Sequence, residues 1–355
     1  MLNLENMIKT QSRLELPPLG PGWAGAVMGL GITSSLMDIH LSPIMGHLPA
    51  EIMLGAATLL ALALAVGFIK YRNPGFYASD MPAWGMVSMG ILALGSAYSL
   101  IFNAWPIHAF CWAVGTVLGV ITCVRFLHFL IFNHHPAPAF TWGLPLVAPM
   151  VAATSSAQLA PHAGDWGSTV HGIGVACFVL AWAAAVPVFA FVYLRTFPKI
   201  PTSFATTAWI PLGLVGQSTA AAQLLAGEQW HFRTMIYGIA MLSVGIPLAV
   251  YALVKHWGAA LGGTPMSYNP TWWASTFPVG TCCLGTHILS TQPAALAWGM
   301  SWMNGISAAL LVLLLVHVAW AAFGVIKIIE NPFRPVRTNG PSAVAQLGLA
   351  NSASH

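Results

Sequence analysis

The stretch LGAATLLALALAVGFI (Leu54–Ile69) is an apolar run without a charged residue. A helix that rises about 1.5 Å per residue needs about 20 apolar residues to cross the roughly 30 Å hydrocarbon core of a bilayer. Two further runs are similarly apolar, WAVGTVLGVITCVRFLHFLIF (Trp112–Phe132), with Arg125 as its one charged residue, and ISAALLVLLLVHVAWAAFGVI (Ile306–Ile326). These runs predict transmembrane helices, and they decide the fold class.

The composition of the whole chain supports the same class. Only 6% of the 355 residues are charged and 57% are hydrophobic, whereas soluble domains carry roughly 25% charged residues to hydrate their surface. We therefore expect an all-α integral membrane protein, which excludes a soluble enzyme, a nucleic-acid-binding protein and a secreted disulfide scaffold. The five cysteines lie in apolar runs without metal-ligand spacing, so we expect free thiols and no cofactor or metal.

Ten runs have the length and character of membrane spans, and the loops between them are short. A leader (1–19), one membrane domain (20–328) and a disordered cytoplasmic tail (329–355) follow from this pattern. The spans are expected at about 20–38, 49–70, 81–103, 107–132, 139–160, 167–195, 204–227, 231–256, 269–291 and 296–328.

The basic residues predict how the chain is oriented. With a cytoplasmic N-terminus and ten spans, all 12 lysines and arginines except Arg233 lie at or near the cytoplasmic side. Asp38, Glu51, Asp165 and Glu228 fall on the opposite side. The positive-inside rule thus favours cytoplasmic N- and C-termini.

A repeated landmark relates the odd-numbered spans. Each begins near a tryptophan, and these tryptophans are separated by 61, 58, 67 and 64 residues; they are Trp23, Trp84, Trp142, Trp209 and Trp273. An interfacial aromatic belt is the alternative explanation. The odd spans are also rich in Gly and Pro, whereas the even spans are aliphatic and mostly lack internal proline. We therefore predict five helical hairpins in a pseudo-fivefold arrangement, with the odd helices around a central pore and the even helices facing lipid.

The predicted pore carries no fixed charge, because no Asp, Glu, Lys or Arg lies in the middle of an odd span. Proline is expected to kink the inner helices at Pro149, Pro211 and Pro278. Hydroxyl, amide and glycine positions are the lining candidates, above all Gly29, Ser88, Gly213, Gly280, Thr281 and Gln217, with Thr33, Ser34, Ser35, Ser96, Thr154, Ser155, Ser156, Ser218 and Thr286. The alternative for each small residue is close helix packing.

One aromatic residue stands out when the five tryptophan landmarks are superposed. Four residues after each lie Val27, Ser88, Leu146, Gly213 and Phe277. Phe277 thus places a bulky ring beside Pro278, where a ring across a narrow apolar tube would block passage. Packing between helices is the alternative.

The segments GPGWAGAVMGLG (Gly20–Gly31), TWGLPLVAPMVAAT (Thr141–Thr154) and WWASTFPVG (Trp272–Gly280) resemble the tellurite-resistance/dicarboxylate transporter family, which includes plant slow anion channels, yeast malate permeases and fungal sulfite exporters. The resemblance runs from about Pro21 to Lys327. It implies ten helices in five hairpins, a pore lined by the odd helices, a homotrimer with one pore per subunit in the cell inner membrane, and a phenylalanine gate that falls on Phe277.

We therefore expect a channel or facilitator for small anions such as malate, sulfite, tellurite, chloride or nitrate, and no enzymatic activity. A proton-coupled transporter of organic or sulfur oxyanions, through His287 or His171, is the alternative. A haem-binding redox protein is a remote third possibility, since five histidines lie near the bilayer, His108, His128, His171, His287 and His317.

Overall fold

The computed structural model of the protein describes residues 18–133, 137–196, 200–262 and 268–330, so the predicted leader up to residue 17 and the tail from residue 331 lie outside the described part. Every regular element within those ranges is a helix, which confirms the all-α class. The longer helices are α2 (Ala24–Met45), α3 (Leu48–Tyr71), α4 (Met81–Phe102), α5 (Trp105–Phe132), α6 (Gly143–Leu159), α7 (Gly167–Thr196), α8 (Ile210–Leu225), α9 (His231–Leu261), α10 (Thr276–Thr291) and α12 (Met303–Glu330), with a short α11 (Pro293–Ala297) before the last.

Seven of these helices are long and apolar enough to cross a membrane: α2, α3, α4, α5, α7, α9 and α12. The fifth, seventh and ninth predicted spans instead correspond to α6, α8 and α10, which have 17, 16 and 16 residues. Nearly every residue of these three helices is buried within the protein. A helix surrounded by other helices does not meet lipid along its sides, so neither its length nor its hydropathy has to match the hydrocarbon core.

A 3₁₀ helix leads into each of the helices that follow the tryptophan landmarks. These are η1 (Pro21–Trp23), η2 (Ala78–Asp80), η3 (Phe140–Trp142), η6 (Thr202–Trp209) and η8 (Pro270–Ser275), before α2, α4, α6, α8 and α10. All the landmark tryptophans except Trp84 are buried, at 2 to 8% exposure. An interfacial belt would leave these rings at the headgroup level, so burial shows that they pack against neighbouring helices.

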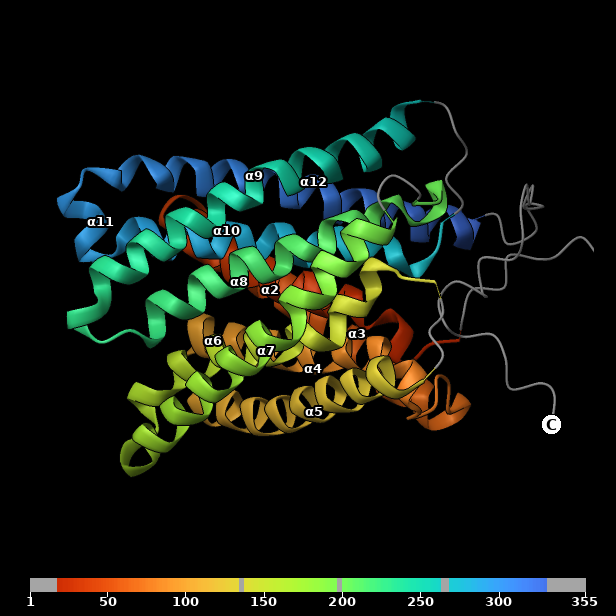
Figure 1. Ribbon diagram of the computed structural model, residues 1–355, viewed down its shortest axis with the longest axis horizontal. Helices are drawn as coiled ribbons and strands as arrows, with labels where there is room; N and C mark the ends of the chain where they lie inside the picture. Colours follow the sequence, from red (N-terminus) through yellow and green to blue (C-terminus); the bar gives the residue numbers. More distant parts are fainter. Residues whose placement is uncertain (1–17, 134–136, 197–199, 263–267, 331–355) are drawn as a thin grey trace, which may run out of the picture.

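The contacts between helices form a closed order. Among the inner helices, α2 contacts α4, α4 contacts α6, α6 contacts α8, α8 contacts α10, and α10 returns to contact α2. Each also packs against the next long helix along the chain, α3, α5, α7, α9 and α12 respectively. Figure 1 shows most of these helices running roughly along the long axis of the molecule, with α5 along one side, α9 and α12 along the other, and α7 crossing obliquely in front.

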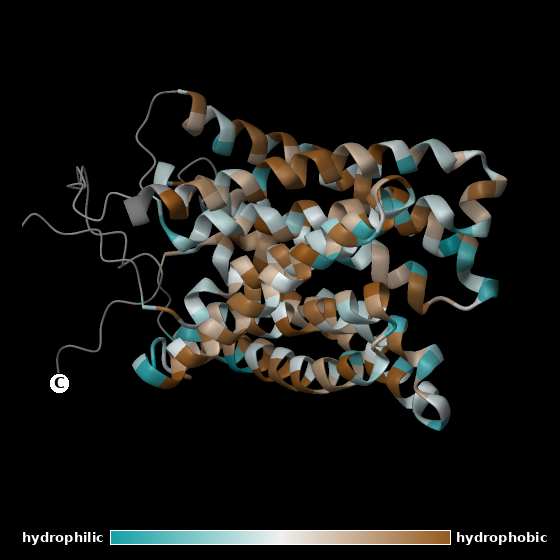
Figure 2. Ribbon diagram, turned by 180° about the vertical axis from the view of Figure 1, so that it is seen from behind, coloured by the Kyte–Doolittle hydropathy of each residue, from teal (hydrophilic) through white to brown (hydrophobic). Residues whose placement is uncertain are grey.

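Burial separates the two sets of helices. In the outer helices α3, α5, α7, α9 and α12 only 17 to 39% of the most apolar window is buried, against 72% in α2 and 56% in α4. The exposed side chains of the outer helices are large and aliphatic or aromatic, and Figure 2 shows hydrophobic residues along the body of the molecule with hydrophilic ones gathered at its ends. This is the surface of a multi-pass membrane protein.

The backbones of α8 and α10 approach each other closely. A methyl group at Gly216 would overlap the backbone of Thr281 and Cys282, and one at Gly285 would overlap the carbonyl of Gly216. Both positions need glycine because the two backbones are in contact there, the usual role of small residues between membrane helices.

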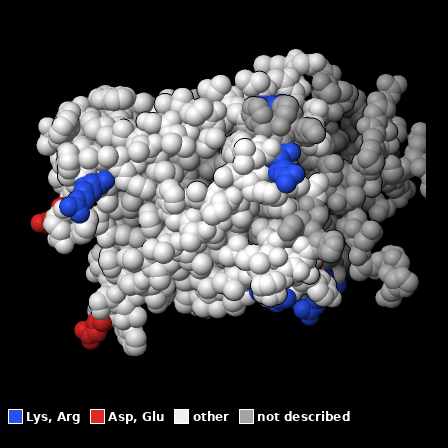
Figure 3. Space-filling view, viewed as in Figure 1, with Lys and Arg blue, Asp and Glu red and all other residues white. Residues whose placement is uncertain are grey.

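Charged side chains lie at the two ends of the described bundle and leave its middle bare. Figure 3 shows the visible acidic groups at one end, with a single basic group near them, and the other basic groups towards the opposite end. Lys70 and Arg195 lie in the last turns of α3 and α7. The Arg125 guanidinium reaches from α5 to within 5.0 Å of the ring centre of Phe76, in the loop before α4, so it extends towards the end of the bundle as a snorkelling arginine does.

Candidate functional site

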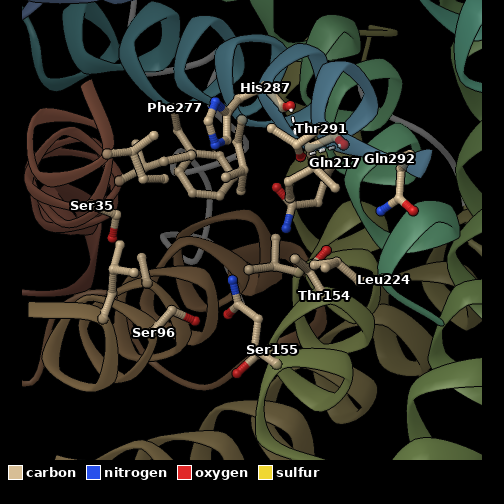
Figure 4. Close-up of a pocket in the computed structure, with 18 residues that line it drawn as sticks. Ser35, Ser96, Thr154, Ser155, Gln217, Leu224, Phe277, His287, Thr291 and Gln292 are labelled. Carbon is tan, nitrogen blue, oxygen red and sulfur yellow. Dashed lines mark hydrogen bonds between the residues drawn. The ribbon is translucent and has the colours of Figure 1, made fainter. Parts of the chain in front are cut away.

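A cavity of about 340 Å³ lies between the five inner helices. Each of them contributes to its wall, as Figure 4 shows in part. The lining consists of Ile32, Ser35 and Ile39 from α2; Ala93, Ser96 and Leu100 from α4; Val151, Thr154, Ser155 and Gln158 from α6; Gln217 and Leu224 from α8; Phe277, Leu284, His287, Ile288 and Thr291 from α10; and Gln292 after it.

The lining residues recur at a helical spacing. Pairs seven positions apart line the cavity on every inner helix: Ile32 and Ile39, Ala93 and Leu100, Val151 and Gln158, Gln217 and Leu224, and Leu284 and Thr291. Seven residues are close to two turns, so each pair lies on one face of its helix. The first member stands nine residues after the tryptophan landmark in the first three repeats and eight after it in the fourth, so equivalent faces of these helices meet at the cavity.

The wall combines aliphatic surface with neutral polar groups. Gln217 is only 3% exposed, and its Oε1 atom has no hydrogen-bond partner; the Oε1 atom of Gln158 is likewise buried without a partner. Figure 4 shows the amide of Gln217 pointing into the space between α6 and α10. A buried amide without a protein partner costs free energy, so these two amides are available to a ligand or to water.

Phe277 lies at one end of the cavity. It belongs to the first turn of α10 and is 3% exposed, whereas Thr291 and Gln292 line the cavity at the other end of the same helix. At 1.5 Å per residue the cavity thus extends about 20 Å along α10. A ring at one end of such a cavity could occlude it, and Figure 4 shows the side chain of Phe277 among the lining residues.

A buried histidine supports the wall from outside. His108 of α5 is fully buried and reaches between α4 and α6, where its Nδ1 lies 2.8 Å from Ser99 Oγ and its Nε2 lies 2.8 Å from Ser155 Oγ. Ser155 is part of the cavity wall, so this outer helix holds a lining hydroxyl in place.

Of the predicted site residues, six line the cavity together: Ser35, Ser96, Thr154, Ser155, Gln217 and Phe277. Ser88 lies on the α5 side of α4, where its Oγ donates to the carbonyl of Gly115 at 2.7 Å. The glycines lie between helices: Gly29 faces Thr276, Gly280 faces Ile32, and Gly213 lies beside Pro278. Thr281 donates to the carbonyl of Pro278 at 2.8 Å.

The three prolines predicted as kinks have different positions. Pro149 lies inside α6. Pro211 and Pro278 lie in the first turns of α8 and α10, directly after η6 and η8. A proline in the first turn removes no intrahelical hydrogen bond, so these two start a helix after a 3₁₀ segment instead of bending it.

The membrane histidines divide by location. His287 lines the cavity. His171 lies outside it, on α7, where its Nε2 is 2.9 Å from the carbonyl of Leu225. His317 is packed in a buried aromatic cluster with its ring centre 4.8 Å from that of Trp209 and 5.3 Å from that of His256.

One polar lining residue, Gln158, and the supporting histidine His108 escaped sequence reasoning. Gln158 stands four positions after Thr154 and seven after Val151, so the helical period from a recognised polar position could have found it. His108 lies on an outer helix, and no local pattern connects it with Ser155.

Comparisons with known proteins agree with this architecture. The family model described as voltage-dependent anion channel matches residues 18–326. A sulfite efflux pump of Arthroderma benhamiae is 24% identical over 303 residues, covering 75% of this chain and 80% of the relative, and the sulfite efflux pump of Trichophyton rubrum gives the same figures. An uncharacterized transporter of Methanocaldococcus jannaschii is 22% identical over 299 residues, covering 75% of this chain and 83% of the relative. The match over almost the whole membrane domain shows that the chain belongs to the voltage-dependent anion channel family, the tellurite-resistance/dicarboxylate transporter family that its inner helices resemble.

Proposed function

We propose that the protein is a channel or facilitator for small anions, with the cavity between the inner helices as part of its conduction path. The observation that carries the proposal is a cavity walled by five helices, lined with neutral polar and aliphatic groups, in a chain of an anion-transporting family. Hydroxyl and amide groups solvate an anion weakly, and weak binding permits throughput.

In this proposal the ten long helices cross the membrane as five pseudo-fivefold hairpins, with both termini cytoplasmic. The closed order of contacts among the inner helices and the 3₁₀ helix before each of them support the repeat. The basic residues near the C-terminal ends of the outer helices support the orientation. The bacterial inner membrane and a homotrimer with one pore per subunit are part of the proposal on family resemblance.

Phe277 is the proposed gate, because its ring occupies one end of the cavity. Gln217, with an unpartnered amide oxygen in the wall, is the proposed polar contact for the passing anion. Gly213, at the register position that corresponds to Phe277, lies beside Pro278 and outside the lining.

The anion is proposed to be an oxyanion or halide, with sulfite to be tested first because two of the relatives are named sulfite efflux pumps. Planar-bilayer recording and liposome flux with sulfite, malate, nitrate and chloride at two pH values would test the function. Resolvable single-channel anion currents support the channel. Anion flux that follows a proton gradient without resolvable currents supports the second candidate, a proton-coupled carrier, which the presence of His287 in the wall favours. Reconstituted protein that moves none of these anions would exclude both.

A further inference from the structure

Two histidines from distant parts of the chain meet beside the cavity. His40 lies near the C-terminal end of α2, and His287 lies in the second half of α10. Their ring centres are 5.2 Å apart in an edge-to-face arrangement. His287 is part of the cavity wall, and Figure 4 shows its imidazole among the lining residues, close to Phe277.

The hydrogen bonds around this pair define which ring nitrogens are free. Ser307 Oγ donates to the carbonyl of Cys283 at 2.9 Å, so the same oxygen accepts from Nε2–H of His40 at 2.9 Å. On the other ring, Nδ1–H of His287 donates to Oδ1 of Asn304 at 3.0 Å. In the neutral state, therefore, the lone pairs are on Nδ1 of His40 and Nε2 of His287.

No carboxylate is bonded to either imidazole in the described part of the chain. The nearest acidic residue in sequence, Asp38 on α2, is bonded to His47 at 2.6 Å, and Glu51 acts on His47 as well. The other polar groups around the pair are neutral: the Cys283 thiol of α10, and the Asn304 amide and Ser307 hydroxyl of α12. The outer helix α9 contributes an apolar contact, in which Met235 packs against Leu289. Across the cavity, α4, α6 and α8 present only neutral side chains, Ser96, Thr154, Ser155, Gln158 and Gln217 among them.

We propose that His40 and His287 form a proton-linked binding site for an oxyanion beside the cavity. A proton from solution converts a free lone pair into an N–H donor that an anionic oxygen can accept. Two imidazolium groups at this separation repel each other, so the pair takes up its second proton when an anion compensates the charge. Anion binding and proton binding then strengthen each other by the same factor, as linkage requires.

The class of ligand follows from this geometry. Two N–H donors from two helices suit the oxygens of one oxyanion better than a single halide contact. The site therefore favours an oxyanion over a halide, with the added proton taken from solution. This inference rests on the proposed function, because it takes the cavity as the path of the anion, and it adds a site that depends on pH to a wall that is otherwise uncharged.

Proton uptake on anion binding is the direct test. Titration calorimetry of the purified full-length protein with sulfite, in two buffers of different ionisation enthalpy, counts the protons taken up at about pH 6. We expect net uptake by the unmodified protein and its loss in His40→Gln and in His287→Gln, since glutamine keeps a neutral hydrogen-bonding group. His171→Gln is the matched control, because that histidine lies outside the cavity.

Flux in liposomes gives a second readout. Between about pH 7.5 and pH 5.5 sulfite flux should rise about tenfold in the unmodified protein and in His171→Gln, within the usual range of coupling factors, and should stay flat in His40→Gln and in His287→Gln. Elution volume and melting temperature establish that each variant is folded. Sulfite flux with the same pH profile and proton uptake in all four proteins would overturn the inference and leave the proposed function standing. Absence of anion flux from all four would overturn the proposed function and the inference together.

Discussion

Removing the ring of Phe277 should open the passage if the ring occludes it. Phe277 is 3% exposed and must leave its packing to let an anion pass. Burying a phenylalanine side chain is worth about 1.5–3 kcal/mol relative to exposing it, which is the barrier that Phe277→Ala would remove. Since about 1.4 kcal/mol corresponds to a factor of ten in rate, conductance should rise about 10- to 100-fold.

The assay is single-channel recording in planar bilayers with symmetrical chloride. Phe126→Ala is the matched control, because Phe126 is 2% exposed, lies on the outer helix α5 and packs against Trp142 at 6.5 Å between ring centres, away from the cavity. Both substitutions delete the same atoms from a buried site and should destabilise the fold by similar amounts, about 3–5 kcal/mol. Only the one at Phe277 should raise the current.

Two results would refute this reasoning. One is unchanged conductance in a Phe277→Ala protein that elutes and melts like the control. The other is an equal rise in both variants, which would attribute the current to loosened packing and not to the loss of a gate. Phe277→Leu offers a graded check, since a smaller apolar side chain should give an intermediate conductance.

Three further predictions concern other parts of the chain. Gln217→Leu removes a buried amide that faces the cavity, and since a hydrogen bond to a charged group is worth about 1.5–3 kcal/mol, the anion concentration for half-maximal flux should rise at least about tenfold; an unchanged value would exclude an amide contact. Gly216→Ala forces a methyl group into the backbone of α10 and should destabilise the protein by about 1–3 kcal/mol, measured as a lower melting temperature, whereas Gly172→Ala, with no atom nearby, should leave it unchanged; equal melting temperatures would contradict the close approach. The hydrogen bond to Asp38, with its charge, raises the pKa of His47, so an NMR titration of labelled histidine should place its midpoint above the ordinary imidazole value and Asp38→Asn should lower it; this interaction stabilises the fold fully below the unfolded-state pKa and is lost as pH rises through the folded-state pKa.

Much of the architecture can be read from the sequence, for two physical reasons. A chain with 6% charged residues cannot hydrate a globular surface, and in lipid the backbone has to satisfy its own hydrogen bonds, so apolar runs of sufficient length predict helices. The outer helices obey this rule most clearly, because they face lipid. Phe277 could also be found, because superposing the tryptophan landmarks sets it apart from the smaller or non-aromatic side chains of the other repeats.

The rotation of each inner helix about its own axis could not be read in this way. In an amphipathic helix, the apolar stripe in the sequence predicts which face is buried. The helices α6, α8 and α10 are buried nearly all round and have no such stripe. Ser88 and Ser96 are therefore equivalent candidates in the sequence of α4, yet one faces Gly115 of α5 and the other faces the cavity.

The composition thus determined on its own that this chain is a helical membrane protein, and the spacing of its tryptophans indicated which helices lie inside. Only the tertiary structure decided which side chains share the central space, and that His40 meets the lining residue His287 from a distant part of the chain. The reason is that each inner helix packs between two inner neighbours and an outer partner, so its rotation is set by contacts with residues far away in the sequence and not by any periodicity of its own.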